Sequence, residues 1–349
     1  MPHTSLDSPV RCAIIGYGPI FNWGWVHARW INAVADFSLA AICDKDPGCA
    51  VRARYDFPEV DTYTDLHEVL ARDDIDLVTV VTPHNTHASI VLDCLNAGKH
   101  VVVDKPMCIS VAEATTMIDT AEKVDKTLAV FHNRRHDGNV RAIKEVIEQG
   151  RIGEVFHIEL SSCGYGRPAD SWRARKDISG GLLYDWGSHA IDWALNMIPG
   201  DIAQVTGFFH KRVWSDVSNE EQTRAVILFE NGAVVDILQS ILAYAGRPLW
   251  YILGTKGAIV DGGRDAIKGY TEQLNGPSGG SFKLITEGGE QKVPYRESDW
   301  LTYYIDMVDH LLRDGTVPVS GEEGRRVITV LETAEKSAKS GRSEDVPYR

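Results

Sequence analysis

The sequence predicts an α/β protein in two domains, a doubly wound parallel sheet followed by an α+β domain built on a large, mainly antiparallel open sheet. Two patterns support this prediction. Apolar strand candidates alternate with helix candidates over the first 131 residues, an order typical of parallel sheets. Residues 202–260 then show long strands of alternating polarity without intervening helices, which is typical of antiparallel sheets. We therefore expect domains at 1–131 and 132–349.

The expected elements of the first domain alternate between strand and helix. Strands are expected at 10–15, 37–43, 62–63, 77–81, 100–103 and 127–131. Helices are expected at 25–35, 65–71, 86–96 and 110–123. Gly98 is a typical helix stop, and Ser110 with Glu113 has the spacing of a capping box.

The second domain has a different pattern. The tripeptide Glu230-Asn231-Gly232 between two strand candidates is a typical hairpin sequence, and the loop 163–179 is rich in Arg, Gly and Trp. We expect the two amphipathic helices that end the chain to pack back on the first domain. Helices are expected at 138–149, 299–312 and 322–340, and strands at 155–161, 225–229 and 233–239.

Composition excludes several classes of function. The 349 residues are 44% hydrophobic and 24% charged, which is ordinary for a globular protein, and the net charge of −13 argues against a general nucleic-acid binder. No apolar run approaches the roughly 18 residues that a membrane span needs, and the polar start of the chain is unlike a signal peptide. We expect a cytoplasmic protein whose six cysteines are buried thiols rather than disulfide partners.

A glycine-rich turn follows the first strand. Gly16-Tyr17-Gly18 lies between a strand and a helix, where a Rossmann fold binds the pyrophosphate of a dinucleotide at a helix N-terminus. The usual third glycine is missing, because position 21 is Phe; Gly24 takes that role if residues 19–23 carry a three-residue insertion. We expect cofactor contacts here from Gly16, Gly18, Pro19 and Ile20.

Asp44 ends the second strand, where an acid can accept hydrogen bonds from the ribose hydroxyls of the adenosine half. A carboxylate there repels a 2′-phosphate, so we predict NAD as the cofactor. Lys45 next to it softens this preference and keeps NADP as an alternative. The turn-like sequence Asp44-Lys45-Asp46-Pro47 is a second explanation for the aspartate.

The strands expected at 77–81 and 100–103 are each followed by polar residues. In a sheet of strand order 3-2-1-4-5-6, strands four to six bind the nicotinamide half of the cofactor, so these residues should face it. Near the cationic ring a lysine would lose its proton more easily, because like charge disfavours the ammonium form, and could then accept the proton of an alcohol. The alternatives are a surface role for Lys105 and a helix-capping role for Asn85. Cofactor contacts are expected from Thr82, Pro83, Asn85, His87, Asp104 and Lys105.

The segment 180–192 combines two acids with a histidine. On a regular helix Asp185 and His189 share a face at i and i+4, and Asp192 lies three residues beyond His189. An aspartate beside a histidine orients the imidazole and raises its pKa, which suits proton relay. The spacing also fits a metal site, but no second His or Cys stands nearby at ligand spacing, so we expect no metal. A buried histidine bonded to a helix neighbour is the remaining alternative.

Together these segments resemble the Gfo/Idh/MocA family, the relatives of glucose–fructose oxidoreductase and inositol 2-dehydrogenase, over nearly the whole chain. Residues 97–101 (AGKHV) running into Asp104-Lys105-Pro106 are similar to the family's AGKHV…EKP segment, and 180–192 to its GG…DxGxHxxD segment. Residues 131–135 (FHNRR) resemble the segment after strand six in scyllo-inositol dehydrogenase-like members. Asp104 replaces the family's Glu, and the insertion at 19–23 would place Trp23 or Trp25 over cofactor or substrate.

The resemblance implies an NAD(P)-dependent oxidoreductase that interconverts a secondary alcohol and a ketone on a sugar, sugar derivative or cyclitol. Lys105 or His189 would handle the hydroxyl proton, with Asp185 beside them, and the choice of principal base stays open. Two alternatives also stay open, a catalytically silent NAD(P)-binding regulator and an enzyme that uses NAD transiently to process a glycoside. Substrate contacts are expected from Arg134, Tyr165, Trp172, Arg173, Asp185 and His189.

The expected partners follow from the same interpretation. The substrate is a small molecule, and neither nucleic acid nor a membrane is expected as a partner. The open face of an antiparallel sheet needs cover. We therefore expect a homodimer or homotetramer formed through that sheet.

Overall fold

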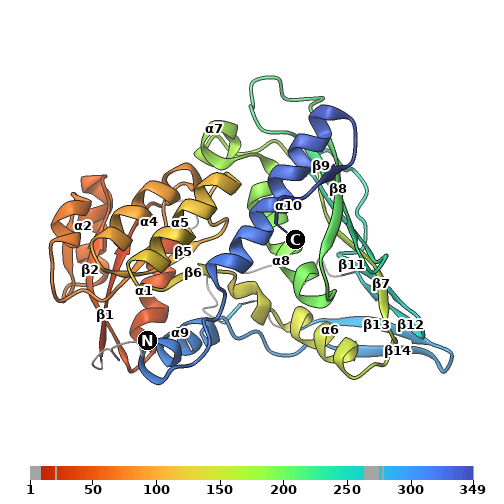
Figure 1. Ribbon diagram of the computed structural model, residues 1–349, viewed down its shortest axis with the longest axis horizontal. Helices are drawn as coiled ribbons and strands as arrows, with labels where there is room; N and C mark the ends of the chain where they lie inside the picture. Colours follow the sequence, from red (N-terminus) through yellow and green to blue (C-terminus); the bar gives the residue numbers. More distant parts are fainter. Residues whose placement is uncertain (1–8, 20–21, 263–274, 277–278, 349) are drawn as a thin grey trace.

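The computed structural model describes residues 9–19, 22–262, 275–276 and 279–348, and Figure 1 shows them arranged around two sheets. The first sheet is parallel throughout, with the strand order β3-β2-β1-β4-β5-β6. This order confirms the predicted Rossmann fold. Its strands are β1 (Val10–Ile15), β2 (Phe37–Cys43), β3 (Asp61–Tyr63), β4 (Leu77–Val80), β5 (His100–Asp104) and β6 (Leu128–Phe131).

The helices around the first sheet include one that the sequence analysis missed, α2. Pro47 is its first residue, and Asp46 caps it by accepting a hydrogen bond from the amide of Gly48. The turn-like sequence at 44–47 is thus the start of a helix. The helices are α1 (Trp23–Ala33), α2 (Pro47–Asp56), α3 (Leu66–Leu70), α4 (His87–Asn96) and α5 (Val111–Lys123), with a 3₁₀ turn, η1 (His84–Thr86), before α4.

The second sheet is mainly antiparallel, as predicted, and its described part has the strand order β14-β13-β12-β11-β7-β10-β9-β8-β15. The pairing of β7 with β10 is parallel. Its strands are β7 (Val155–Cys163), β8 (Ile202–His210), β9 (Gln222–Phe229), β10 (Val234–Ser240), β11 (Trp250–Gly254), β12 (Gly257–Asp261), β13 (Ser281–Thr286), β14 (Gly289–Pro294) and β15 (Glu344–Asp345).

Two C-terminal helices join the sheets. In Figure 1 the long helix α10 (Gly321–Ser340) runs between them, packing on α5 and β6 on one side and on β8 on the other. Helix α9 (Thr302–Arg313) packs on the first sheet, where the hydroxyl of Tyr303 donates to the carbonyl of Val130 at 2.9 Å. The remaining elements are η2 (Asn133–His136), α6 (Gly138–Glu148), η3 (Trp172–Ala174), α7 (Lys176–Ser179), the π-helical turn η4 (Leu183–Gly187) and α8 (Ser188–Met197).

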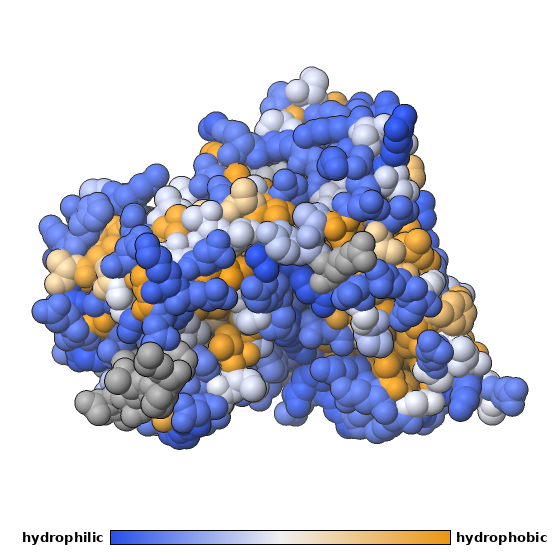
Figure 2. Space-filling model, viewed as in Figure 1, coloured by the Kyte–Doolittle hydropathy of each residue, from blue (hydrophilic) through white to orange (hydrophobic). Residues whose placement is uncertain are grey.

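Among the described residues, helices cover one face of the second sheet and leave the other face open. Every second residue of β9 is buried, and the residues between them are not. Phe208 and Leu228, on the uncovered face, are 49% and 39% exposed. Figure 2 shows apolar residues among polar ones along the side of the molecule that β7 and its neighbours form.

The described part of the chain contains no helix with the length and apolarity of a membrane span. All six cysteines are free and buried. Burial raises the pKa of the Cys43 and Cys94 thiols to about 12, so these two stay protonated near neutral pH.

Candidate active site

A cleft opens where β1, β2, β4 and β5 end, the edge at which open α/β sheets bind ligands. Nine residues predicted from the sequence line it: Gly16, Gly18, Pro19, Asp44, Thr82, Pro83, Asp104, Trp172 and Arg173. Trp172 and Arg173 come from the η3 turn, which the fold brings to the mouth of the first sheet. Ile20 lies outside the described residues, as does Phe21.

The glycines of the turn have distinct roles. Gly16 has φ +107°, and a Cβ there would lie 2.3 Å from the carbonyl oxygen of Val81. A Cβ at Gly24 would lie 2.5 Å from the carbonyl oxygen of Gly16, so Gly24 allows helix α1 to approach the turn. A Cβ at Gly18 would meet no atom of the described residues within 4 Å, apart from those of its two chain neighbours. Gly18 therefore leaves space in the lining of the cleft, which fits the close approach of a pyrophosphate.

Asp44 is fixed at the same end of the cleft. Its Oδ2 accepts a hydrogen bond from the amide of Tyr17 at 2.6 Å, and its Oδ1 accepts one from the amide of Asp46 at 2.9 Å. Lys45 and Asp46 line the cleft beside it. The position fits a ribose hydroxyl and disfavours a 2′-phosphate.

Some residues of the loop after β4 line the cleft, and others hold the loop in place. Asn85 is exposed and does not line the cleft. His87 is buried, with Nδ1 2.9 Å from the carbonyl oxygen of Pro106 and Nε2 2.8 Å from that of Thr82, so it ties two loops together. His84, which the sequence analysis did not select, lines the cleft, and its Nδ1 lies 2.8 Å from the carbonyl oxygen of Ser179.

Lys105 points at Asp185. Its Nζ donates to Oδ1 of Asp185 at 2.8 Å and to the backbone carbonyl of Asp185 at 3.0 Å. Arg173 Nη1 donates to the same Oδ1 at 2.6 Å. Burial alone would raise the pKa of Asp185, but the charges of Lys105 and Arg173, with His84, hold it well below its ordinary value. Asp185 is therefore a carboxylate that joins two cations.

The expected contact between Asp185 and His189 is not formed. Residues 183–187 form a π-helical turn, which adds a residue to the helix, so the i,i+4 spacing of a regular helix does not hold across it. Asp192 also misses His189 and accepts a bidentate hydrogen bond from Arg135. The three side chains thus do not converge on one another, and neither aspartate orients the imidazole.

His189 is instead surrounded by aromatic rings. Its ring lies edge-to-face with Trp186 at 5.6 Å and with His132 at 5.8 Å, and parallel to Trp193 at 6.3 Å. Its Nδ1 is buried without a hydrogen-bond partner among the described residues. Burial, together with the charge of Lys105, lowers the pKa of His189 well below 6.5, opposite to the predicted direction. The imidazole is therefore neutral near pH 7.

The remaining predicted substrate residues lie in different places. Arg134 is buried between two indoles, with its Cζ 4.8 Å from the ring centre of Trp186 and 5.0 Å from that of Trp300. Tyr165 is 47% exposed and stacks on Tyr244 with ring centres 3.9 Å apart. Neither residue lines the cleft.

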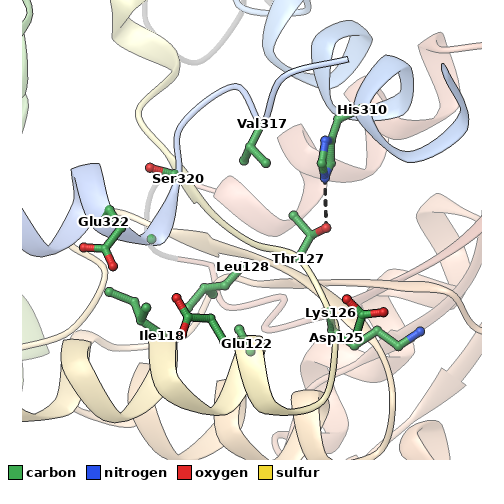
Figure 3. A pocket seen from close by; sticks show the side chains of 12 residues that line it. Ile118, Glu122, Asp125, Lys126, Thr127, Leu128, His310, Val317, Ser320 and Glu322 are labelled. Atoms are coloured by element: carbon green, nitrogen blue, oxygen red, sulfur yellow. Dashed lines mark hydrogen bonds between the residues drawn. The ribbon is translucent and has the colours of Figure 1, made fainter. Parts of the chain in front are cut away.

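Another cavity lies between the end of α5 and the start of α10, and Figure 3 shows its lining. Thr127 and Leu128 place it at the amino end of β6, away from the cleft, and Thr127 Oγ1 lies 2.9 Å from His310 Nε2. No predicted site residue lines it. The chemistry of the chain is therefore expected at the cleft.

Both parts of the chain match known proteins. Residues 10–132 match the model of an oxidoreductase family with an NAD-binding Rossmann fold, and 140–260 match the Gfo/Idh/MocA C-terminal domain. The scyllo-inositol 2-dehydrogenase (NADP(+)) IolW of Bacillus subtilis is 27% identical, over 96% of this chain and 95% of its own length. The D-apiose dehydrogenase of Rhizobium rhizogenes is 28% identical, over 97% of each chain.

A crystal structure of a Klebsiella pneumoniae protein described as an oxidoreductase has a TM-score of 0.84 and 28% identity, covering 98% of this chain and 96% of that one. Fold, cleft and sequence similarity therefore agree over both sheets. The chain belongs to the Gfo/Idh/MocA family of NAD-dependent oxidoreductases.

Proposed function

We propose that this enzyme interconverts a secondary alcohol and a ketone on a sugar, sugar derivative or cyclitol, with NAD or NADP as the hydride carrier. The observation that carries the proposal is the contact of Lys105 Nζ with Asp185 Oδ1 at 2.8 Å, at the end of β5 and beside the cleft. The similarity to an inositol dehydrogenase and a sugar dehydrogenase supports this substrate class.

The cofactor, when bound, exchanges a hydride with the substrate carbon. The chain supplies two groups for the hydroxyl proton, Lys105 and His189. Lys105 is held by two oxygens of Asp185, so its ammonium group can stabilise an alkoxide or return a proton to a ketone. His189 is neutral near pH 7, the protonation state that a base requires, although the burial and the Lys105 charge that lower its pKa also weaken it as a proton acceptor.

Substrate binding is proposed for the side chains closest to this pair. Trp172 offers an apolar face at the cleft, where it contacts His84 edge-to-face at 4.7 Å. Arg134 would act indirectly, because it fixes Trp186, which in turn contacts His189. Tyr165 lies outside the cleft, so it would contact the substrate only if the ligand extended beyond the cleft or a neighbouring subunit completed the site.

We also propose that the enzyme is a homodimer or homotetramer, formed through the uncovered face of the second sheet. Exposed Phe208 and Leu228 support this proposal, because apolar side chains on an open sheet gain burial in a subunit contact. Sedimentation equilibrium of the protein, compared with a Leu228→Glu variant, tests it. A monomer in both cases would contradict it.

The activity is tested by following NADH and NADPH absorbance over a panel of inositols, free sugars, sugar acids and glycosides. We expect reduction of the cofactor by at least one cyclitol or sugar, at a rate that is lower by roughly 100-fold or more in Lys105→Ala. Sugar released from a glycoside without net NADH would indicate the transient use of the cofactor instead. Cofactor binding without turnover of any compound would favour a regulator.

A further inference from the structure

We propose that Arg173 is a positioning residue that controls the proton on Lys105 by sharing Asp185 with it. This inference rests on the proposed function, in which Lys105 handles the hydroxyl proton. It assigns to Arg173 a role different from that of a direct substrate ligand. The two roles predict different outcomes when the guanidinium is removed.

The geometry is a single carboxylate oxygen between two cations. Oδ1 of Asp185 accepts from Lys105 Nζ at 2.8 Å and from Arg173 Nη1 at 2.6 Å. Because a guanidinium stays charged at all working pH values, Arg173 holds this oxygen whether or not Lys105 carries a proton. Of the two cations on this oxygen, only Lys105 can lose its proton and with it the ion pair to Asp185.

The place of Arg173 is fixed by its surroundings. Its guanidinium lies over the ring of Trp172, with Cζ 4.6 Å from the ring centre, and its backbone carbonyl accepts from Asn219 Nδ2 at 2.7 Å. Arg173 also lines the cofactor cleft. It therefore brings a permanent positive charge from the second domain to the end of β5.

Other charges around Lys105 do not replace this effect. The three histidines that interact with Lys105 or Asp185 are neutral near pH 7, because burial lowers the pKa of each. The carboxylate of Asp185 places a negative charge beside Lys105 Nζ, and Arg173 places a positive charge on the same carboxylate oxygen. The groups that face Lys105 are Asp104 on β5, His84 on η1, His132 after β6, Arg173 on η3, Asp185 on η4 and His189 on α8.

Without the Arg173 guanidinium, Lys105 would be the remaining cation on Asp185 Oδ1. The substitution should therefore stabilise the ammonium form of Lys105. We expect Lys105 of the Arg173→Gln variant to react with acetic anhydride about tenfold more slowly than in the unmodified protein near neutral pH, since only the neutral amine reacts. Mass spectrometry of the Lys105 peptide across a pH series measures this in the whole protein without cofactor or substrate. Arg173→Lys, which keeps the charge, should restore most of the reactivity.

Arg175→Gln is the matched control, because Arg175 is exposed and pairs with Asp177 at the surface. Its labelling curve should match that of the unmodified protein. In turnover assays Arg173→Gln should shift the acid limb of kcat/KM to higher pH and leave the substrate KM within about twofold. If no compound is turned over but Lys105 is still labelled more slowly in Arg173→Gln, the proposed function would be wrong and this inference would stand.

Three results would overturn the role of Arg173. The first is an unchanged Lys105 labelling curve in Arg173→Gln, with folding verified by thermal unfolding. The second is a large rise in substrate KM with an unchanged pH profile, which would make Arg173 a substrate ligand. The third is a loss of reactivity in Arg173→Lys equal to that in Arg173→Gln, because charge would then not be the cause.

Discussion

At the scale of single residues, the site depends on which partners Asp185 and His189 have. Asp185 serves Lys105 and Arg173, while His189 has aromatic neighbours and a buried Nδ1 without a partner among the described residues. A carboxylate with two cations stays ionised, and an imidazole without an acid stays neutral. The two groups thus differ in charge near pH 7, because Asp185 carries a negative charge and His189 carries none.

The carboxylate of Asp44 should determine cofactor choice. We expect NAD to bind more tightly than NADP, and Asp44→Ser to narrow the difference by about tenfold, or about 1.4 kcal/mol, because the charge that repels a 2′-phosphate is removed. Calorimetric titration with both cofactors measures this. Lys45→Ala is the companion variant and should weaken NADP only. Tighter NADP binding to the unmodified protein would contradict the prediction.

The proton-handling residues should affect turnover far more than cofactor binding. Lys105→Ala and His189→Ala should each lower kcat roughly 100-fold or more, the scale of lost acid–base assistance. NADH fluorescence titration should give nearly unchanged affinity, since neither side chain lines the cleft. Lys123→Ala, at the exposed end of α5, is the control. A variant with near-normal turnover would remove that residue from the mechanism.

At the scale of elements, the sequence predicts strands better than helix irregularities. The strands Val10–Ile15 and Phe37–Cys43 have the predicted bounds, because continuous apolar runs predict buried parallel strands well. Helix α2 was missed because only Cys49, Ala50 and Ala53 of it are buried, which leaves little apolar periodicity to detect.

Local pairing could not be predicted where the backbone departs from regular geometry. The π-helical turn at Leu183–Gly187 moved Asp185 away from His189 and towards Lys105, which lies 80 positions earlier in the chain. Ser110 caps α5 as predicted, but the Glu113 carboxylate accepts a hydrogen bond from the amide of Ile109 rather than from that of Ser110. Such choices depend on tertiary contacts that a spacing rule does not contain.

The inserted turn before α1 should act on the cofactor through Trp23. Trp23 lines the cleft and packs on Trp30 and Trp300 with ring centres 6.1 and 6.2 Å away, whereas Trp25 does not line it. Trp23→Ala should raise the Kd for NAD several-fold, and Trp25→Ala should not.

Trimming residues 19–23 to a plain Gly-x-Gly-x-x-Gly turn should alter the substrate KM or the oligomeric state. Unchanged kinetics and assembly would make the insertion a tolerated bulge.

At the scale of the whole molecule, the two sheets are joined by the helices at the end of the chain. Helix α10 packs on both parts, and α9 closes the first sheet with Tyr303 and Tyr304. His27 of α1 lies in this contact, with Nδ1 2.7 Å from the hydroxyl of Tyr304, among Trp30 and Phe131. The contact is thus mainly aromatic, and His27 is the imidazole buried within it.

This ring should make the fold sensitive to mild acid. Burial lowers the pKa of His27 from 6.5 to about 4, only partly opposed by Asp104. Between these two pH values His27 is protonated in the unfolded chain but neutral in the folded chain. The stability that the neutral His27 gives the folded state is therefore fully present above pH 6.5 and is lost as the pH falls towards 4. The free energy of unfolding should therefore drop by about 2 kcal/mol between pH 7 and pH 5 because of His27.

The test compares urea unfolding of the unmodified protein and of His27→Gln at both pH values. Gln cannot take up the proton, so the variant should lack that part of the drop, whatever its stability at pH 7. Other buried groups, such as His136, whose pKa burial also lowers to about 4, contribute to both proteins and cancel in the difference. Equal drops in the two proteins would mean that His27 is protonated in the folded state, and that the contact between α1 and α9 tolerates a buried charge.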